Sequence, residues 1–439
     1  MSWQKRYQEK LVTHEEAAKS IKSGDTISVP GACAVPYKLL NAVGDRWEEL
    51  EDVTVATVLY MDMINFLEGK YKGHIGTHSV FIGPLERFFI EQGNVKVTSC
   101  NLSLCKELFQ EVIGGNVVAM EVSPPDEWGY MSYGPVGTSV NASLVEPANR
   151  VIVQVNDKVP YVYGKDACIH VDEVEMICEF HHALPVLPDI PVDDNDRKMA
   201  EYIVERIPNG ATIQIGIGPV ANAIGFFLDQ KKDLGIHTEM LTDSMMHLAK
   251  KGIINGSKKT FYPGKITFGF GIGSQELYDF MNRNPKLEAM PIYDINNINN
   301  IAMNDNYISI NNALSVDLTG QVASETLGHS LFSCTGGQHD FVMGAALSKG
   351  GKSFIALNSV AKTEGGLVSR ITSALPLGTV VTTPRSIVRY VVTEHGIADL
   401  WLKSVDERVK QMITIAHPDF RDQLEKEARD AGLLPKEVW

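Results

Sequence analysis

The chain has 439 residues, of which 44% are hydrophobic and 21% charged, and its formal net charge is -14. This composition excludes extended disorder, and the length is too great for one hydrophobic core, so two or three domains are expected. The acidic balance, without a run of lysine or arginine, argues against non-specific binding to nucleic acid or to an anionic membrane surface.

The N-terminal segment and the cysteines favour a cytoplasmic protein. The chain starts with a polar stretch, residues 1–7, followed by a helical pattern rather than an apolar signal sequence. No segment approaches the roughly 18 uninterrupted apolar residues that span a bilayer. The six cysteines are scattered and form no Cys-x-x-Cys pair, which fits reduced, buried thiols. We therefore expect no membrane association.

Helix and strand patterns alternate along the first half of the chain. Thr13 is the expected N-cap of a helix, with Glu16 completing a capping box, and the helix is expected to continue to Gly24. A further helix is expected over residues 84–92. Strands rich in β-branched residues are predicted at residues 25–30, 53–60, 95–99, 117–122 and 150–155. Their nearly continuous apolar character is typical of parallel strands covered on both faces, so the fold class is α/β.

A segment rich in proline and acidic residues separates the two halves of the chain. Three prolines between residues 185 and 191 precede a run of acidic and amide residues, a composition that cannot lie inside a packed element. We expect an N-terminal domain over residues 1–185, a linker over 186–196 and a C-terminal domain over 197–439. The second half then repeats the helix–glycine–strand–glycine order of the first, with a helix over 197–207 and a strand over 211–215. Two domains of similar layout are therefore predicted.

The glycines after this strand form a candidate anion site. Gly216 and Gly218 lie between the strand and a helix expected from about Val220 to Gln230. Glycines let the backbone approach a ligand, and amides at a helix N-terminus suit a phosphate or an oxyanion. The same residues can equally form only a tight turn. Ala221 occupies the position of the third glycine of the dinucleotide-binding fingerprint, which leaves nucleotide reduction a weak alternative.

A carboxylate follows shortly after this turn. Glu239 is expected at the end of a short parallel strand, at the edge where α/β sheets bind ligands, although alone it could be an ordinary surface glutamate. Glycine clusters at 269–274 and 334–341, together with Asn311, could converge on the same crevice. No Gly-x-Ser-x-Gly occurs at a strand–helix junction, which argues against a serine thioesterase. No metal site is predicted, because the adjacent His181 and His182 would face opposite sides of a strand.

Several of these motifs together resemble a known family. The segments that carry the resemblance are Gly216-Ile-Gly-Pro-Val, Gly235-Ile-His-Thr-Glu-Met, Gly336-Gly-Gln-His-Asp-Phe, Val392-Thr-Glu-His-Gly-Ile-Ala-Asp-Leu and Ile415-Ala-His-Pro-Asp-Phe-Arg. The combination is similar to the acetyl-CoA hydrolase/transferase branch of the family I CoA-transferases, and within it to the 4-hydroxybutyrate and butyryl-CoA:acetate CoA-transferases. Residues 123–129 and 155–160 match as well, so the resemblance covers nearly the whole chain.

The resemblance implies two tandem, open, mainly parallel α/β domains of the CoA-transferase (NagB/RpiA-like) type, an active site in a cleft, and at least a homodimer. It makes Glu239 the covalent nucleophile. The residues that it implies for binding CoA or an oxyanion are Gly216, Ile217, Gly218, Pro219, Val220, Gly336, Gly337 and Lys362, and Asn311 is implied for the acyl or carboxylate group. Pro219 departs from the alanine or asparagine that relatives often have, and it has no N–H to donate. Amide donors are therefore expected from Gly216, Gly218 and Val220.

The implied reaction moves CoA between a short-chain acyl-CoA, of the butyryl or 4-hydroxybutyryl type, and acetate. It is a ping-pong reaction through a glutamyl-CoA thioester, with CoA as a substrate and no permanently bound cofactor. A glutamate has a reference pKa of about 4.3, so it is ionised at neutral pH and attacks without a base. An acyl-CoA hydrolase that uses the same glutamate is the alternative. A non-catalytic sensor or sugar-phosphate binder on the same scaffold is a more distant one.

Overall fold

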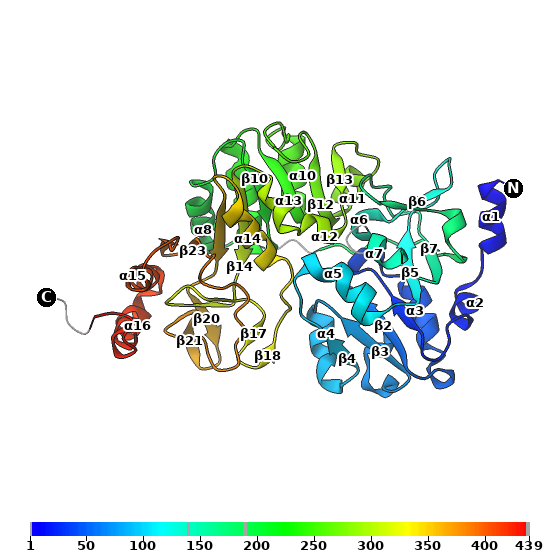
Figure 1. Cartoon of the computed structure of the whole chain (residues 1–439), viewed down its shortest axis with the longest axis horizontal. Coiled ribbons are helices and arrows are strands. Elements are labelled where there is room, and N and C mark those ends of the chain that lie inside the picture. Colours follow the sequence, from blue (N-terminus) through cyan, green and yellow to red (C-terminus); the bar gives the residue numbers. More distant parts are fainter. Residues whose placement is uncertain (1, 138–140, 147, 188–190, 436–439) are drawn as a thin grey trace. The chain divides into compact units, whose positions relative to one another are not determined.

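The computed structural model describes residues 2–137, 141–146, 148–187 and 191–435. The chain forms two compact units, which do not simply follow chain order (Figure 1). Unit 1 consists of Met1–Pro188, Glu239–Met246 and Ile266–Ile295, and unit 2 of Asp189–Thr238, His247–Lys265 and Asn296–Trp439. The predicted domain boundaries at residues 185 and 197 stay a prediction. The two units are defined by contacts between segments, and such contacts do not show which segments fold alone.

Unit 1 contains a parallel sheet in the order β4-β3-β2-β1-β5-β7-β9. Its strands are β1 (Thr26–Ser28), β2 (Val53–Thr57), β3 (Ile75–Ser79), β4 (Val95–Val97), β5 (Val117–Val122), β7 (Arg150–Val155) and β9 (Met176–Glu179). β6 (Tyr130–Ser132) and β8 (Cys168–His170) form a separate antiparallel ribbon. The strands predicted over 117–122 and 150–155 agree with β5 and β7 at both ends.

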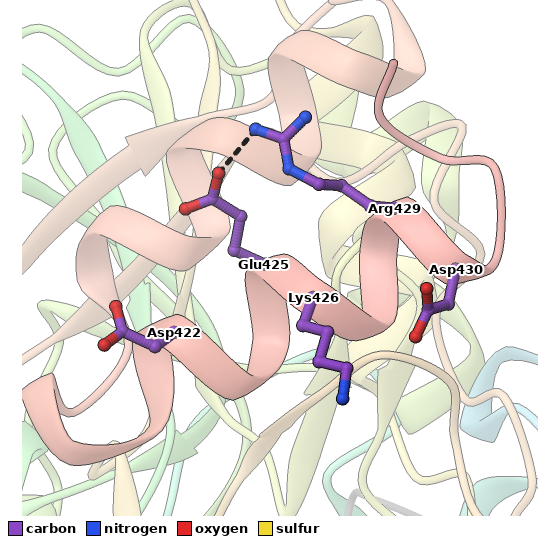
Figure 2. Close-up of a pocket in the computed structure, with 5 residues that line it drawn as sticks. All are labelled: Asp422, Glu425, Lys426, Arg429 and Asp430. Carbon is purple, nitrogen blue, oxygen red and sulfur yellow. Dashed lines mark hydrogen bonds and ion pairs between the residues drawn. The ribbon is translucent and has the colours of Figure 1, made fainter. Parts of the chain in front are cut away.

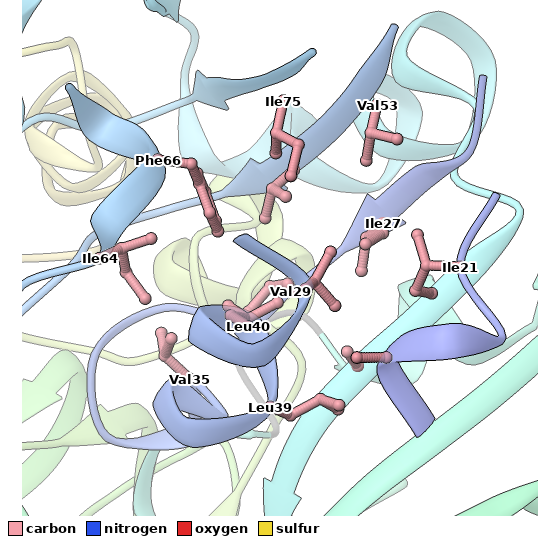
Figure 3. Close-up of a cluster of buried hydrophobic side chains, with 14 of the residues drawn as sticks. Ile21, Ile27, Val29, Val35, Leu39, Leu40, Val53, Ile64, Phe66 and Ile75 are labelled. Carbon is pink, nitrogen blue, oxygen red and sulfur yellow. The ribbon is translucent and has the colours of Figure 1, made fainter. Parts of the chain in front are cut away.

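A hydrophobic core on one face of this sheet holds the ends of the strands in place. Side chains from β1 and β2, among them Ile27 and Val53, pack with Leu39 and Leu40 of the following helix and with Phe66 (Figure 3). All five are at most 2% exposed. Burying an apolar side chain of this size contributes about 1.5–3 kcal/mol, so the cluster is a major source of stability for unit 1.

The second large sheet has the order β13-β12-β11-β10-β14-β19-β23-β24. Its strands are β10 (Thr212–Ile215), β11 (Gly235–Leu241), β12 (Ile266–Gly271), β13 (Leu287–Ala289), β14 (Tyr307–Asn312), β19 (Lys352–Ala356), β23 (Tyr390–Thr393) and β24 (Gly396–Asp399). β24 pairs antiparallel with β23, whereas β14 pairs parallel with both β10 and β19. Apart from β24, the strand order along the chain repeats that of the first sheet, which confirms the predicted similarity of layout.

The boundary between the units lies within β11. The start of β11 pairs with β10 in unit 2, where Ile213 is opposite Ile236. Its last residues, from Glu239 onward, belong to unit 1 together with β12 and β13. The second sheet therefore draws its strands from both units.

Helices cover the sheets. The predicted helices are present, but their lengths differ from the prediction. The α-helices are α1 (Trp3–Lys10), α2 (His14–Lys19), α3 (Tyr37–Gly44), α4 (Pro84–Phe89), α5 (Cys105–Glu107), α6 (Gly134–Gly137), α7 (Asn141–Val145), α8 (Asp194–Val204), α9 (Pro219–Phe227), α10 (Asp243–Lys250), α11 (Gln275–Met281), α12 (Ile292–Ile295), α13 (Ile298–Ala302), α14 (Gln338–Leu347), α15 (Val405–Ile415) and α16 (Pro418–Asp430). Among the described residues, no helix is long and apolar enough to cross a bilayer. Unit 2 also contains the small sheets β16 (Val322–Ala323), β15 (Ser315–Asp317), β22 (Ile371–Thr372); β17 (Thr326–Leu327), β18 (Ser330–Leu331); and β20 (Val360–Thr363), β21 (Gly366–Ser369).

Several helix boundaries differ from the prediction, and two of the differences have a clear local feature. The capping box of Thr13 and Glu16 is present, but α2 ends at Lys19 rather than near Gly24. Gly24 lies beyond the helix and has a φ of 81°. α8 starts at Asp194 rather than Arg197, because the Asp193 side chain accepts hydrogen bonds from the amides of Asn195 and Asp196. Part of the expected linker, residues 188–190, lies outside the described residues.

The cysteines are free, and most are buried as expected. Cys33, Cys105, Cys178 and Cys334 are buried and Cys100 is partly buried, but Cys168 is exposed. Cys168 departs from the expectation because it begins β8, where side chains alternate in direction and the next residue, Ile169, is the one buried in the core.

Candidate functional site

The turn after β10 has the conformation that a glycine-based site requires. Gly218 precedes α9 with φ of 121° and ψ of 179°, in the region that strongly favours glycine. A β-carbon there would also lie 3.2 Å from the Nδ2 atom of Asn312. Pro219 is the first residue of α9, a position where its missing N–H is not needed by the helix.

The amides of this turn are not equivalent. The amide of Gly216 donates to the carbonyl of Ile310 at 2.9 Å and so continues the pairing of β10 with β14. The expectation that Gly216 donates to a ligand is therefore wrong in this structure. Gly218 and Val220 remain as candidate donors at the start of the helix. Ile217 is 61% exposed, whereas Val220 is 6% exposed and anchors α9 to its surroundings.

Two consecutive asparagines at the end of β14 support the same turn. Asn311 donates to Ser309 Oγ at 2.9 Å and to Gln214 Oε1 at 3.3 Å, and its own Oδ1 accepts from Gln214 at 3.3 Å. Asn312 donates from Nδ2 to the carbonyl of Ile217 at 2.7 Å. Asn311 thus lies beside the glycine turn, with its Oδ1 atom 3.8 Å from where a β-carbon on Gly216 would be. Asn312, which the sequence did not point to, makes a direct hydrogen bond to the turn.

The second glycine pair precedes α14, which packs against β14 and β19. Gly336 has φ of 61°, and Gly337 is the N-cap of α14 without a side-chain hydrogen bond. The N-terminus of this ten-residue helix carries a partial positive charge. The Nε2 atom of Gln338, in its first turn, is buried without a hydrogen-bond partner among the described residues. Gln338 was missed because a glutamine at a helix start carries no sequence signal.

Lys362 lies on an exposed hairpin formed by β20 and β21. The base of the hairpin is held by Ser359, whose carbonyl accepts from the amide of Arg370 at 2.9 Å. Ser359 in turn donates its amide and hydroxyl to the carboxylate of Glu394, at 2.9 and 2.5 Å. Glu394 is only 8% exposed. It follows β23 directly and lies in the segment 392–400, one of those that carry the family resemblance. No pattern in the sequence indicated that Ser359 is its partner.

Glu239 is the fifth residue of β11 and is half-buried. The sequence predicted Glu239 at the end of a strand. That prediction is wrong, because the strand continues through the buried Met240 and Leu241 and Glu239 lies within it. In unit 1, the carbonyl of Glu239 lies close to β12, only 3.1 Å from where a β-carbon on Gly269 would be.

A second buried carboxylate lies at the end of the first sheet. Glu121 is 1% exposed and accepts from Gln154 Nε2 at 2.5 Å, from Asn156 Nδ2 at 2.9 Å and from His182 Nε2, which lies 2.8 Å away. The hydrogen bond to Glu121 raises the pKa of His182 above its usual value. These partners satisfy Glu121, so we interpret the network as structural. Within the described part of the chain, no group of three His, Cys, Asp or Glu side chains could hold a metal ion.

A hollow on α16 is not a candidate site. It measures about 520 Å³ and is lined by Asp422, Glu425, Lys426, Arg429 and Asp430. Figure 2 shows that these side chains all project from one helix and that Arg429 pairs with Glu425, at 2.6 Å. Charged residues on a single exposed helix do not enclose a ligand as a substrate site does.

Comparison with known proteins establishes the family. Residues 1–188 match the model of the acetyl-CoA hydrolase/transferase N-terminal domain, and residues 273–428 match that of its C-terminal domain. The chain belongs to the acetyl-CoA hydrolase/transferase family. The resemblance inferred from the motifs is therefore confirmed.

Individual relatives align over nearly the full length. The chain is 39% identical to the 4-hydroxybutyrate coenzyme A transferase of Clostridium kluyveri, over 97% of this chain and 99% of that protein. It is 38% identical to the butyryl-CoA:acetate CoA-transferase of Anaerostipes caccae, over 99% of both. The crystal structure of RipA from Yersinia pestis superposes with a TM-score of 0.94 at 36% identity, covering 99% of this chain and 100% of that one. The predicted fold class is thereby confirmed.

Proposed function

We propose that this protein is a CoA-transferase that moves CoA between a short-chain acyl-CoA and acetate, with Glu239 as the covalent nucleophile. The observation that carries the proposal is full-length similarity to two named CoA-transferases. The half-buried position of Glu239 within β11 supports it, since a covalent intermediate must be kept from water. Hydrolysis of acyl-CoA is the less favoured alternative.

The proposed reaction has two halves. The Glu239 carboxylate attacks the thioester carbonyl, and a tetrahedral oxyanion forms and collapses to an acyl–glutamyl anhydride with release of CoA thiolate. The thiolate then attacks the glutamyl carbonyl, which expels the first carboxylate and leaves a glutamyl-CoA thioester. The acceptor carboxylate reverses these steps. Every intermediate keeps an activated acyl bond, so the exchange needs no ATP.

We assign oxyanion and CoA binding to the backbone around Gly218 and Val220 and to the start of α14. Amides at a helix N-terminus stabilise negative charge, which both an oxyanion and the phosphates of CoA supply. Asn311 is assigned to the acyl or carboxylate group, and the exposed Lys362 to the phosphates of CoA. CoA is a substrate here, and a homodimer remains a prediction for sedimentation analysis to test.

The decisive experiment is to trap the covalent intermediate. Incubation with butyryl-CoA and no acceptor acid should add the mass of CoA less one water to the peptide that contains Glu239. Glu239→Ala should lose both the adduct and transfer to acetate. Glu288→Ala, on the nearby strand β13 and also half-buried, is the matched control and should keep both.

Two results would sink the proposal. One is an adduct that survives in Glu239→Ala. The other is release of CoA from butyryl-CoA that is as fast without acetate as with it, which would identify a hydrolase.

A further inference from the structure

Unit 1 contains a small apolar cavity close to Glu239. A water-sized sphere can occupy about 40 Å³ of it. The residues that line it are Gly31, Ala32, Val58, Leu59, Leu102, Cys105, Val136, Phe270, Ile272 and Ile292. All lie in unit 1, on segments from both the N-terminal part and the later part of the chain. Among the described residues, the lining contains no charged side chain, hydroxyl or amide.

Two parts of the wall lie beside Glu239. The first is the end of β12 and the residue after it: Phe270 and Ile272 alternate with glycines, and Gly269 leaves room for the Glu239 carbonyl. A β-carbon on Gly269 would also lie 2.8 Å from Cδ1 of Ile292, another residue of the wall. The second is Cys105, whose thiol pKa is raised well above its usual value by burial and, to a lesser degree, by the charges of neighbours that include Glu239.

The cavity limits both the size and the polarity of an occupant. A water molecule needs about 10–15 Å³ of such space, so this cavity accommodates about three non-hydrogen groups. The alkyl tail of a butyryl group beyond its carbonyl has three carbons. A terminal hydroxyl or carboxylate in the cavity would lose its hydration without a side-chain partner, which is costly.

We propose that this cavity holds the alkyl tail of the acyl group and makes the enzyme selective for unsubstituted acids of two to four carbons, with butyrate preferred. The inference rests on the proposed function, because it assumes that Glu239 carries the reacting carbonyl. It distinguishes this chain's substrate from 4-hydroxybutyrate and from dicarboxylates, which the overall similarity leaves open.

Acceptor profiling tests the proposal with acetyl-CoA as donor for the longer acids and butyryl-CoA as donor for acetate. From acetate to butyrate, kcat/KM should rise about fourfold for each methylene group buried. For hexanoate, 4-hydroxybutyrate and succinate it should be at least about tenfold lower than for butyrate. A value for 4-hydroxybutyrate or succinate equal to that for butyrate overturns the inference but leaves the transferase function intact. Absence of transfer to every acid overturns the proposed function instead.

A matched pair of variants locates the selectivity. Leu102→Ala enlarges the cavity and should raise the hexanoate-to-butyrate ratio of kcat/KM about tenfold. Leu108→Ala makes the same change in the same hydrophobic cluster but outside the lining, and should leave the ratio unchanged. Equal shifts in both variants, or none in Leu102→Ala, overturn the assignment.

A milder variant keeps the test valid if Leu102→Ala does not fold. Val136→Ala also enlarges the lining, and it should shift the ratio in the same direction by about threefold. Formation of the glutamyl-CoA adduct shows that each variant is folded and retains its nucleophile. No shift in a folded Val136→Ala enzyme contradicts the inference.

Discussion

The hydroxyl of Ser359 donates to one carboxylate oxygen of Glu394 at 2.5 Å, while the amide of Ser359 donates to the other at 2.9 Å. Ser359 follows β19 and Glu394 follows β23, and these two strands pair with each other. One buried carboxylate therefore joins two adjacent strand ends at the base of the hairpin that carries Lys362.

Glu394→Gln should loosen this hairpin. The amide of glutamine offers one acceptor where the carboxylate offers two, so one donor of Ser359 loses its partner at a cost of about 1–3 kcal/mol. We expect a lower free energy of unfolding in urea, faster proteolysis between Val360 and Ser369, and a higher KM for the CoA ester. Glu364→Gln, at the exposed tip of the same hairpin, is the control. Identical behaviour of the two variants would show that Glu394 does not position the hairpin.

Gly218→Ala should damage the turn after β10. An alanine at φ of 121° is strained by about 1–3 kcal/mol, and its methyl group presses on Asn312. Gly216→Ala offers a comparison, because its β-carbon would meet no atom nearer than 3.5 Å. We expect Gly218→Ala to be the more destabilised in urea and to lose at least about tenfold in kcat/KM. Equal stability of the two variants would contradict this description of the turn.

Lys259 should make the free energy of unfolding depend on pH in the alkaline range. It is 4% exposed, and burial lowers its pKa from 10.5 to about 7 although two carbonyls accept from its Nζ. Between about pH 7 and pH 10.5 the Lys259 side chain is therefore protonated in the unfolded chain but neutral in the folded one. The wild type should gain stability relative to Lys259→Met as pH rises from about 7 to 10, by up to ~1.4 kcal/mol per pH unit.

The control for this titration is the adjacent, exposed Lys258. Lys258→Met should follow the wild type across the same pH range in urea unfolding. A constant difference between wild type and Lys259→Met at every pH would show that Lys259 stays protonated in the folded protein.

His182 should have the opposite pH dependence. Its pKa is raised in the folded state by the hydrogen bond to Glu121, so folding favours the protonated form. This stabilisation is complete below the unfolded pKa of about 6.5 and is lost as pH rises through the folded pKa. Since His182 is partly exposed, we expect an effect on the order of 1 kcal/mol.

Urea unfolding of His182→Gln and His181→Gln between pH 6 and 9 measures this effect. His182→Gln should be most destabilised, relative to the wild type, at the acid end. His181 is exposed and does not contact Glu121 in the described network, so His181→Gln should show no such trend. A trend of equal size in both variants would rule out the Glu121 pair as its cause.

Local patterns predicted much of the fold. Continuous apolar runs located β5 and β7 to the residue, and Thr13 and Glu16 located a helix start, because such signals depend on neighbours in the chain. Where tertiary packing decides, the prediction was wrong. β11 continues past Glu239 because Met240 and Leu241 are buried in unit 1.

The site was predictable only where residue types carry their own signal. The glycine turn was recognised because few other residues adopt its backbone. The roles of Asn312, Gln338 and Glu394 could not be predicted, since each depends on a partner or on burial that no local pattern shows. The same holds for the cavity, whose wall brings Val58 and Leu102 together with Phe270 and Ile292.

The division of β11 between the units has a practical consequence for splitting the gene. A break between residues 187 and 191 yields an N-terminal fragment without β12, β13, α11 and α12, all of which belong to unit 1. That fragment would lack three of the ten residues that line the proposed acyl-tail cavity, namely Phe270, Ile272 and Ile292. Two separately expressed halves would then become active only by reassociation, which suits the chain to fragment complementation rather than to modular exchange of domains.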